Sequence, residues 1–227
     1  LHVSAVQKDP RTYEHINPEE VGNSRNIVVS DQSGKSNIIS RLKTIGIEIK
    51  ETDPKIKKLL EEVKDREFIG YSYDGADASF ELLARRIIGE IPRYILIKEY
   101  DVSVKKNSSG KIISLAKAQL EVDGEKIICK GEGNGPVNAL DNAIRQNVDR
   151  LSKYSEYLKD LKLVDYKVRI LDTGTEAVTR VSIESTDSKG KNWFTIGVSA
   201  NIIDASFKAL VDSLDYKLFK DKAPASL

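Results

Sequence analysis

An internal repeat in the second half of the 227-residue chain constrains the fold more than any other feature. A shift of 66 residues places EYDVSV, which begins at Glu99, over DYKVRI, which begins at Asp165. The same shift places GEGNGPVNALDNAI (131–144) over GVSANIIDASFKAL (197–210) and aligns glycine with glycine and alanine with alanine. A unit of a few strands and one helix leaves a sheet face and an edge uncovered, so the copies must pack on each other or on a partner chain.

Each copy has the pattern of three strands followed by a helix. Apolar and polar residues alternate over 99–104 and 116–122, as in half-buried strands. The dipeptide Asp123-Gly124 then predicts a two-residue hairpin turn, because both central positions need positive φ. An apolar stripe at helical spacing follows and ends at Leu151. The second copy repeats this order, with strands at 165–170, around 181–183 and at 193–198, and a closing helix.

The first 92 residues have a different pattern. They begin with an irregular arm and continue with three helical stripes, one of which starts at Asp53-Pro54, a cap followed by a first-turn proline. We therefore predict an α+β protein made of a linker arm with helical linker subdomains (1–92), a pseudo-two-fold duplicated βββα domain (93–220, repeats at about 93–151 and 161–218) and a frayed tail (221–227).

Composition excludes several classes of function. With 36 Lys+Arg against 35 Asp+Glu the net charge is +1, which disfavours binding to nucleic acid or to an anionic membrane, and no apolar run reaches the length of a membrane span. One Cys and two His cannot form an internal disulfide or a structural zinc site, and no catalytic triad or phosphate-binding loop can be assembled. We expect a cytoplasmic protein with no metal site and no catalysis by these residues alone. Because the sequence begins at Leu1 and contains no Met, we also expect it to be a piece of a longer protein.

The two segments that join a strand to a helix are the candidate binding sites. Segments 131–137 and 197–203 each bring small residues to a helix N-terminus, where backbone amides can receive a carboxylate. A bound amino acid would also need an acceptor for its ammonium group, such as Asp204 or Asn138, and apolar walls. The alternative is that Gly and Ala only allow the strand and the helix to pack closely.

These motifs resemble a known family. GNGPVNALDNAI and ANIIDASFKALVDSL are similar to the C-terminal allosteric domain of 2-isopropylmalate synthases and citramalate synthases. The upstream motifs HVSAV, TYEHINPEEVGN and SDQSGKSNI resemble the linker that follows the catalytic barrel in these enzymes. GYSYDGADASFELLARR (70–86) is more similar to the citramalate-synthase branch, and the resemblance covers nearly the whole chain.

The resemblance implies an acyltransferase that condenses acetyl-CoA with a 2-oxo acid, pyruvate in the citramalate branch. The divalent metal and acetyl-CoA would bind in a TIM barrel that this chain does not contain, so no cofactor is expected here. The family is dimeric, and a His and a Tyr of its linker reach the active site of the neighbouring subunit. His2 and Tyr13 occupy the matching positions and are the predicted catalytic residues, with His2 assisting proton transfer.

The resemblance also implies a homodimer inhibited by a branched-chain amino acid: isoleucine in the citramalate branch, leucine in the isopropylmalate branch. The predicted effector-binding residues lie at the two junctions and are Gly133, Asn134, Gly135, Val137, Asn138, Ala200, Asn201, Ile202, Asp204 and Ala205.

Three alternatives remain at this point. In the first, the chain is the matching part of a 2-isopropylmalate synthase. In the second, it is a stand-alone amino-acid-sensing dimerisation module, and in the third it is a nucleic-acid-binding α+β domain. The last is disfavoured by the near-zero net charge.

Overall fold

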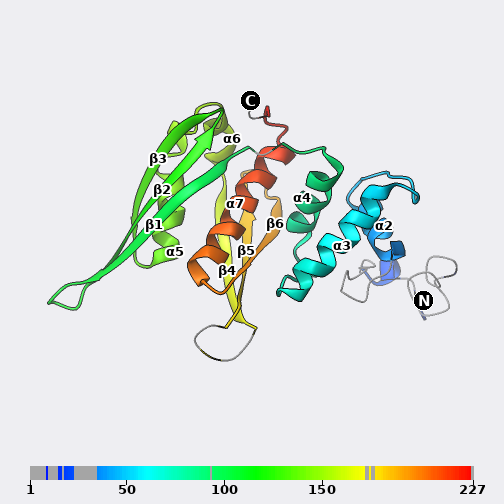
Figure 1. The fold of residues 1–227 in the computed structure, drawn as a ribbon, viewed down its shortest axis with the longest axis horizontal. Helices are drawn as coiled ribbons and strands as arrows, with labels where there is room; N and C mark the ends of the chain where they lie inside the picture. The colour runs from blue at the N-terminus through cyan, green and yellow to red at the C-terminus, as the bar shows by residue number, and fades with distance from the viewer. Residues whose placement is uncertain are drawn as a thin grey trace.

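The computed structural model describes residues 35–92, 94–171 and 177–225, together with 9, 15, 16, 18–22 and 174. Within this part, helices precede two antiparallel three-stranded sheets, each followed by a helix (Figure 1). The predicted α+β class and the duplicated βββα order are confirmed. His2 and Tyr13 lie outside the described residues.

The helical linker contains a short 3-10 turn, η2, and three helices whose apolar faces form one core. The cap predicted at Asp53 is present, because its carboxylate accepts the backbone N–H of Lys55 at 2.8 Å. The core of the three helices includes Phe80 and Tyr73. The elements are η2 (Pro18–Val21), α2 (Lys35–Thr44), α3 (Pro54–Phe68) and α4 (Asp77–Ile88).

Both sheets are antiparallel meanders with the same strand order. Asp123 (φ 53°) and Gly124 (φ 78°) form the predicted hairpin turn. The first strand of each sheet has a register shift at the equivalent place, between Ile97 and Glu99 in one and between Leu163 and Asp165 in the other. The strands are β1 (Leu96–Lys106), β2 (Ile112–Val122), β3 (Glu125–Gly133), β4 (Lys162–Ile170), β5 (Thr179–Thr186) and β6 (Asn192–Ser199).

The helix of the first copy, α5 (Pro136–Arg145), is shorter than its apolar stripe predicts. The Asn147 side chain donates to the carbonyl oxygens of Ala143 (2.8 Å) and Lys130 (3.0 Å), which ties the end of the helix to the edge of the sheet. Leu151 is still buried, but on an irregular connection. That connection is formed by η3 (Val148–Arg150), η4 (Ser152–Tyr154) and α6 (Ser155–Leu158).

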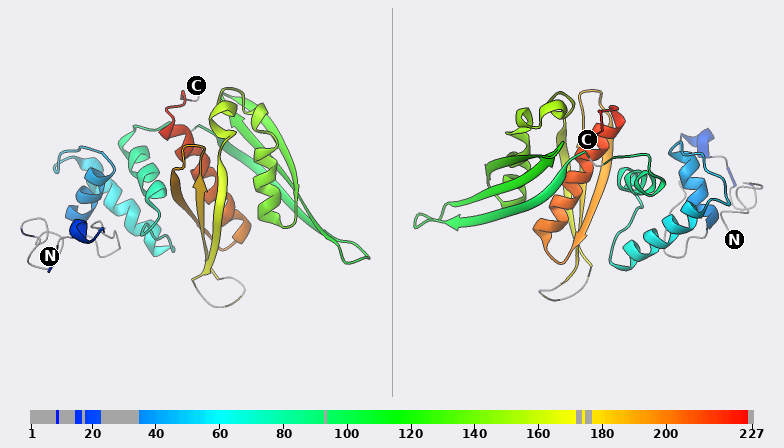
Figure 2. Two further views of the ribbon diagram at one scale, coloured as in Figure 1. Left: turned by 180° about the vertical axis from the view of Figure 1, so that it is seen from behind. Right: turned by 45° about the horizontal axis from the view of Figure 1, so that its top comes forward.

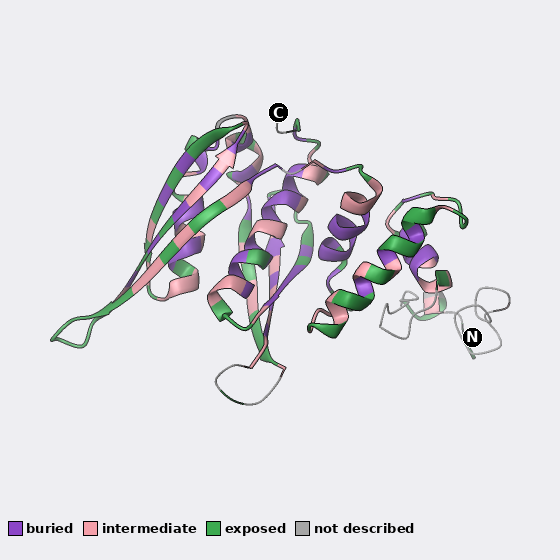
Figure 3. Ribbon diagram, viewed as in Figure 1, coloured by how far each residue is buried: buried purple, intermediate pink, exposed green. Residues whose placement is uncertain are grey.

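The helix of the second copy, α7 (Ile202–Lys220), shares one hydrophobic core with α5 and with the inner faces of both sheets (Figure 3). Glycines let strand and helix approach closely. A Cβ at Gly131 would lie 2.3 Å from the backbone nitrogen of Ala143, and one at Gly197 would lie 2.0 Å from the carbonyl oxygen of Ala205. The close-packing explanation therefore holds for these two glycines.

The outer faces of the two sheets differ, because only the second sheet is covered by the linker helices (Figure 2). Ile196 and Val198 on β6 are buried, and Ile196 belongs to the linker core. The equivalent residues on β3, Lys130 and Glu132, are exposed. Ser79 of α4 also accepts the backbone N–H of Ile196 at 2.9 Å. The linker is thus attached to the second repeat.

The C-terminal residues up to Ala225 pack on the chain, contrary to the predicted fraying. Ala223 is buried in the core. The Tyr154 hydroxyl donates to the carbonyl oxygen of Pro224 at 3.0 Å, and Lys153 donates to that of Ala225 at 2.6 Å.

Candidate functional site

The second junction, between β6 and α7, is closed by its own side chains. The Asn201 side chain is the N-cap of α7 and accepts the backbone N–H groups of Ile203 (2.8 Å) and Asp204 (3.3 Å). Two of the amides predicted to receive a carboxylate are therefore occupied. Ala200, Asn201 and Ile202 are exposed, whereas Ala205 is fully buried beside Gly197.

Asp204, the predicted acceptor for an ammonium group, already has partners from both repeats. The Tyr100 hydroxyl of β1 donates to it at 3.3 Å, and Lys208 pairs with it at 2.7 Å. Burial by itself would raise the pKa of Asp204, but hydrogen bonds from Lys208, Ser199 and Tyr100 hold the pKa below its ordinary value. Asp204 is thus an anion at neutral pH that can accept a ligand's ammonium group if Lys208 moves.

The start of α7 is held between tyrosines of the two sheets. The Tyr100 ring packs edge-on against Phe207, with ring centroids 4.8 Å apart. From the other side, the Tyr166 hydroxyl lies 2.8 Å from Ser206 Oγ. Because Tyr100 and Tyr166 are equivalent in the repeat, the duplication places one tyrosine from each copy on the first turns of the same helix.

The first junction, between β3 and α5, is open. Its N-cap residue, Gly135, is extended (φ −154°), and no side chain in the described part of the chain caps the helix. Pro136 has no N–H to satisfy, so the amides of Val137 and Asn138 are the donors of the first turn. A Cβ at Gly135 would meet no atom of the described residues within 4 Å, so packing among them does not require this glycine.

Gly133 and Asn134, which immediately precede Gly135, pack against the same helix. The backbone N–H of Asn134 donates to Asn138 Oδ1 at 3.2 Å. A Cβ at Gly133 would lie 2.6 Å from the backbone nitrogen of Ala139, so the position requires glycine. The Asn138 side chain is therefore occupied by the strand end and leaves the helix amides uncapped.

A polar group that the sequence analysis missed lies beside this open helix start. Ser114 is fully buried on the inner face of β2, opposite Gly133 in the strand register. Its hydroxyl has no hydrogen-bond partner among the described residues. A buried hydroxyl without a partner is unfavourable, and a hydrogen-bond acceptor beside it would remove that cost. The only signal in the sequence is a serine that replaces an apolar residue in the inward-facing register of β2.

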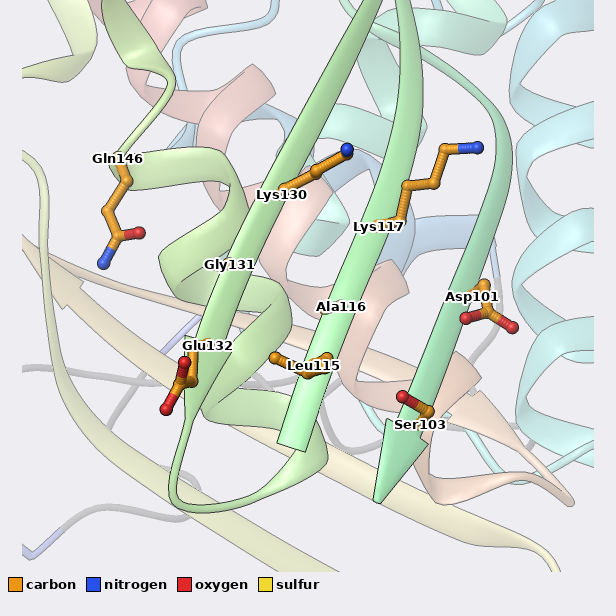
Figure 4. Close-up of a pocket in the computed structure, with 9 residues that line it drawn as sticks. All are labelled: Asp101, Ser103, Leu115, Ala116, Lys117, Lys130, Gly131, Glu132 and Gln146. Carbon is orange, nitrogen blue, oxygen red and sulfur yellow. The ribbon is translucent and has the colours of Figure 1, made fainter. Parts of the chain in front are cut away.

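A cavity of about 470 Å³ lies on the outer face of the first sheet (Figure 4). Lys117 and Lys130 are direct cross-strand neighbours there; Asp101 lies opposite Lys117 on β1, and Glu132 follows Lys130 on β3. None of the predicted effector-binding residues lines this cavity.

Among the described residues there is no group of three His, Cys, Asp or Glu side chains that could hold a metal ion. In the same part of the chain no helix is long and apolar enough to cross a bilayer. Cys129 is buried.

Comparison with known proteins identifies two family matches. The model described as LeuA allosteric (dimerisation) domain matches residues 74–218, from the start of the α4 region to near the end of α7. The model described as homocitrate synthase post-HMGL domain-like matches residues 1–68.

Curated relatives match nearly the whole chain. The (R)-citramalate synthase of Aquifex aeolicus is 47% identical over 98% of this chain, and that of Geobacter sulfurreducens is 44% identical over the same share. The match spans 42% of each of these relatives, so the chain is less than half their length. A probable 2-isopropylmalate synthase of Methanopyrus kandleri is 29% identical over 93% of this chain and 40% of its own length. The resemblance seen in the sequence is confirmed, and the chain belongs to the family of the LeuA allosteric (dimerisation) domain.

Proposed function

We propose that this chain is the regulatory part of a cytoplasmic citramalate synthase, which condenses acetyl-CoA with pyruvate and is inhibited by isoleucine. The observation that carries this proposal is the match of 98% of the chain to relatives named (R)-citramalate synthase at up to 47% identity. The isopropylmalate alternative has weaker support, since the relative with that name is 29% identical. A stand-alone sensor is disfavoured because the matched relatives are more than twice as long as the chain.

We place the effector's carboxylate at the open first junction. Two observations within the described part of the chain support this assignment: no side chain caps the start of α5, and the buried hydroxyl of Ser114 beside it has no hydrogen-bond partner. A helix N-terminus favours an anion through its free amides and its dipole. The second junction offers an acceptor, Asp204, in place of free amides. The other proposed contacts at the two junctions are Gly133, Asn134, Gly135, Val137, Asn138, Ala200, Asn201, Ile202 and Ala205.

The homodimer is also part of this proposal. Apolar side chains next to the connections from β1 to β2 and from β4 to β5 are exposed, among them Val104 (56%), Ile112 (51%) and Ile170 (66%). Exposed apolar residues on neighbouring strands are typical of a protein interface. We propose that a second copy of the chain covers them.

The catalytic roles of His2 and Tyr13 belong to the same proposal. The divalent metal and acetyl-CoA would bind in the barrel of the longer protein, and His2 would assist proton transfer there. The activity of the whole enzyme carrying His2→Ala or Tyr13→Phe tests these two roles, and each variant should be less active than the wild type.

Thermal unfolding with isoleucine, leucine or valine tests the proposed effector. A ligand at about a hundred times its Kd stabilises the native state by roughly 2.7 kcal/mol. We expect isoleucine to raise the Tm selectively. A selective leucine shift would instead support 2-isopropylmalate synthase, and no shift with any of the three would contradict effector binding by this chain.

A further inference from the structure

The linker helix α4 is joined to α7 by charged side chains that lie between the two helices. Glu81 of α4 is 3% exposed and accepts a hydrogen bond from the Tyr216 hydroxyl at 3.1 Å. Arg85 Nε donates to Glu81 at 2.9 Å, and Lys220 lies 3.0 Å from it. Burial raises the pKa of Tyr216 and the carboxylate of Glu81 raises it further, so this phenol remains a hydrogen-bond donor at neutral pH.

A second group of contacts lies beside the first. Arg86 donates through Nη1 to Asp212 (2.9 Å) and through Nη2 to Asp215 (2.7 Å). Ser79 Oγ donates to Asp212 at 3.4 Å and accepts the backbone N–H of Ile196 on β6. One guanidinium thus holds two carboxylates of α7, and Ser79, about two turns earlier on α4, attaches the same helix to the sheet. We call Glu81, Arg85, Arg86, Asp212, Asp215 and Lys220 the α4–α7 network.

Stability alone does not explain such a network. Replacing buried ion pairs by apolar side chains of similar size is often neutral or stabilising, because the desolvation of the charges offsets their attraction. A set of directional contacts does fix the register of two helices, which an apolar contact leaves free to slide. The α4–α7 network therefore permits one position of α4 on α7.

The position of this network on α7 connects it to the effector site. Asp204 lies in the first turn of α7, and Asp212 follows eight residues later, roughly 12 Å along the same helix. A helix moves over this distance as a stiff element, so a displacement of its first turn reaches the network. The linker covers β6 and contacts α7, both in the second repeat, while the outer face of β3 stays exposed.

We infer that α7 and the α4–α7 network transmit effector binding from the strand-to-helix junctions to the linker helices, with Arg86 as the main positioning residue. This inference rests on the proposed function, because it assumes that an effector binds at the junctions. The effector must bind with different affinity to two states of the protein that differ in the position of α7. The network then moves the linker helices together with α7.

Hydrogen exchange of the full chain with and without isoleucine tests the inference. In the wild type, isoleucine should change the exchange rates of amides in α4. Arg86→Met should keep the isoleucine-dependent rise in Tm, but the ligand-induced change in α4 exchange should fall by about fivefold or more. Because Arg86→Met leaves two carboxylates without their partner, a second variant, Arg86→Met/Asp212→Asn/Asp215→Asn, removes all three charges and should show the same loss. Lys57→Met, at an exposed ion pair with Glu61 on α3, is the matched control and should respond as the wild type does.

The outcomes separate the two proposals. If isoleucine, leucine and valine all fail to raise the Tm of the wild type, the proposed function is wrong and the inference is overturned with it. If isoleucine raises the Tm but α4 exchange does not change in the wild type, the effector site stands and the inference is overturned. The same conclusion follows if α4 responds equally in the wild type and in a folded network variant, or if a folded network variant no longer binds isoleucine.

Discussion

The two strand-to-helix junctions occupy the same place in the two copies of the repeat, yet one is closed and the other is open. At the start of α7 the Asn201 side chain accepts hydrogen bonds from two backbone N–H groups. At the start of α5 the equivalent residue is Gly135, which has no side chain to accept hydrogen bonds from the helix amides. The shared residues, such as Gly131 and Gly197, serve packing. The residues that the two copies share therefore maintain the fold. The residues that differ between the copies leave one helix start capped and the other open.

The largest effect on stability is expected at Lys217, near the end of α7, which has no counterpart on α5. Lys217 is 2% exposed and lies 3.2 Å from Asp187 and 3.3 Å from Asp160, with Asp221 as a third partner. Lys217→Met leaves these carboxylates without their cation and should lower the free energy of unfolding by about 3–5 kcal/mol. Chemical denaturation measures this value. A loss under about 1 kcal/mol would show that the second copy does not depend on this cluster.

The pH dependence of the same cluster has a definite sign. Burial tends to raise the pKa of Asp160 and of Asp221, but hydrogen bonds from Ser188 to Asp160, from Lys189 to Asp221 and from Lys217 to both lower it overall. A carboxyl whose folded pKa is lowered contributes stability that is present above its unfolded pKa, about 3.9, and is lost as the pH falls through the folded value. Acid titration of the wild type should therefore show a loss of stability below about pH 4 that is smaller in Lys217→Met.

The next largest effect on stability distinguishes Gly197, which packs against a helix, from Gly135, which lies at the open junction. Gly197→Ala places a Cβ 2.0 Å from a backbone oxygen and should cost about 1–3 kcal/mol or more. Gly135→Ala meets no atom of the described residues within 4 Å and keeps an extended φ, so it should cost under about 1 kcal/mol, from the poorer N-cap alone. Thermal unfolding of the two variants side by side checks this. Equal losses would mean that Gly135 also serves packing.

Part of the fold and of the candidate site could be predicted from the sequence. The strands, the Asp53 cap and the Asp123-Gly124 turn were predictable because their signals are local. The end of α5 was predicted wrongly, since Asn147 bonds to a strand that is distant in sequence. Periodicity also gives no indication of the contacts of Tyr100 with Asp204 or of Arg86 with Asp212, because these pairs are more than a hundred residues apart. The open junction was predicted as a site, but the difference between the two junctions was not.

A smaller effect is expected from removing the cap of the closed junction. Asn201→Ala leaves the amides of Ile203 and Asp204 without their acceptor and should lower stability by about 1 kcal/mol. Asn134→Ala, at the first junction, removes an exposed side chain that caps no helix and serves as the control. Thermal unfolding that showed equal losses in both would contradict the distinction between the junctions.

The smallest effect on stability is expected at Ser114. Ser114→Ala removes a buried hydroxyl that has no partner among the described residues, so without ligand the variant should be as stable as the wild type or more stable by up to about 1 kcal/mol. If the hydroxyl contacts the effector, isoleucine should stabilise the variant less than the wild type. Equal ligand-induced Tm shifts would place the effector elsewhere.

Calorimetric titration of isoleucine into Gly135→Asp is the most direct test of the claim that the open start of α5 receives the effector's carboxylate. An aspartate at this N-cap position supplies its own carboxylate to the free amides of the first turn. We expect this variant to be folded and at least as stable as the wild type but to bind isoleucine at least about tenfold more weakly, which is roughly 1.4 kcal/mol. Unchanged isoleucine affinity in the folded Gly135→Asp variant would show that the start of α5 does not receive the carboxylate.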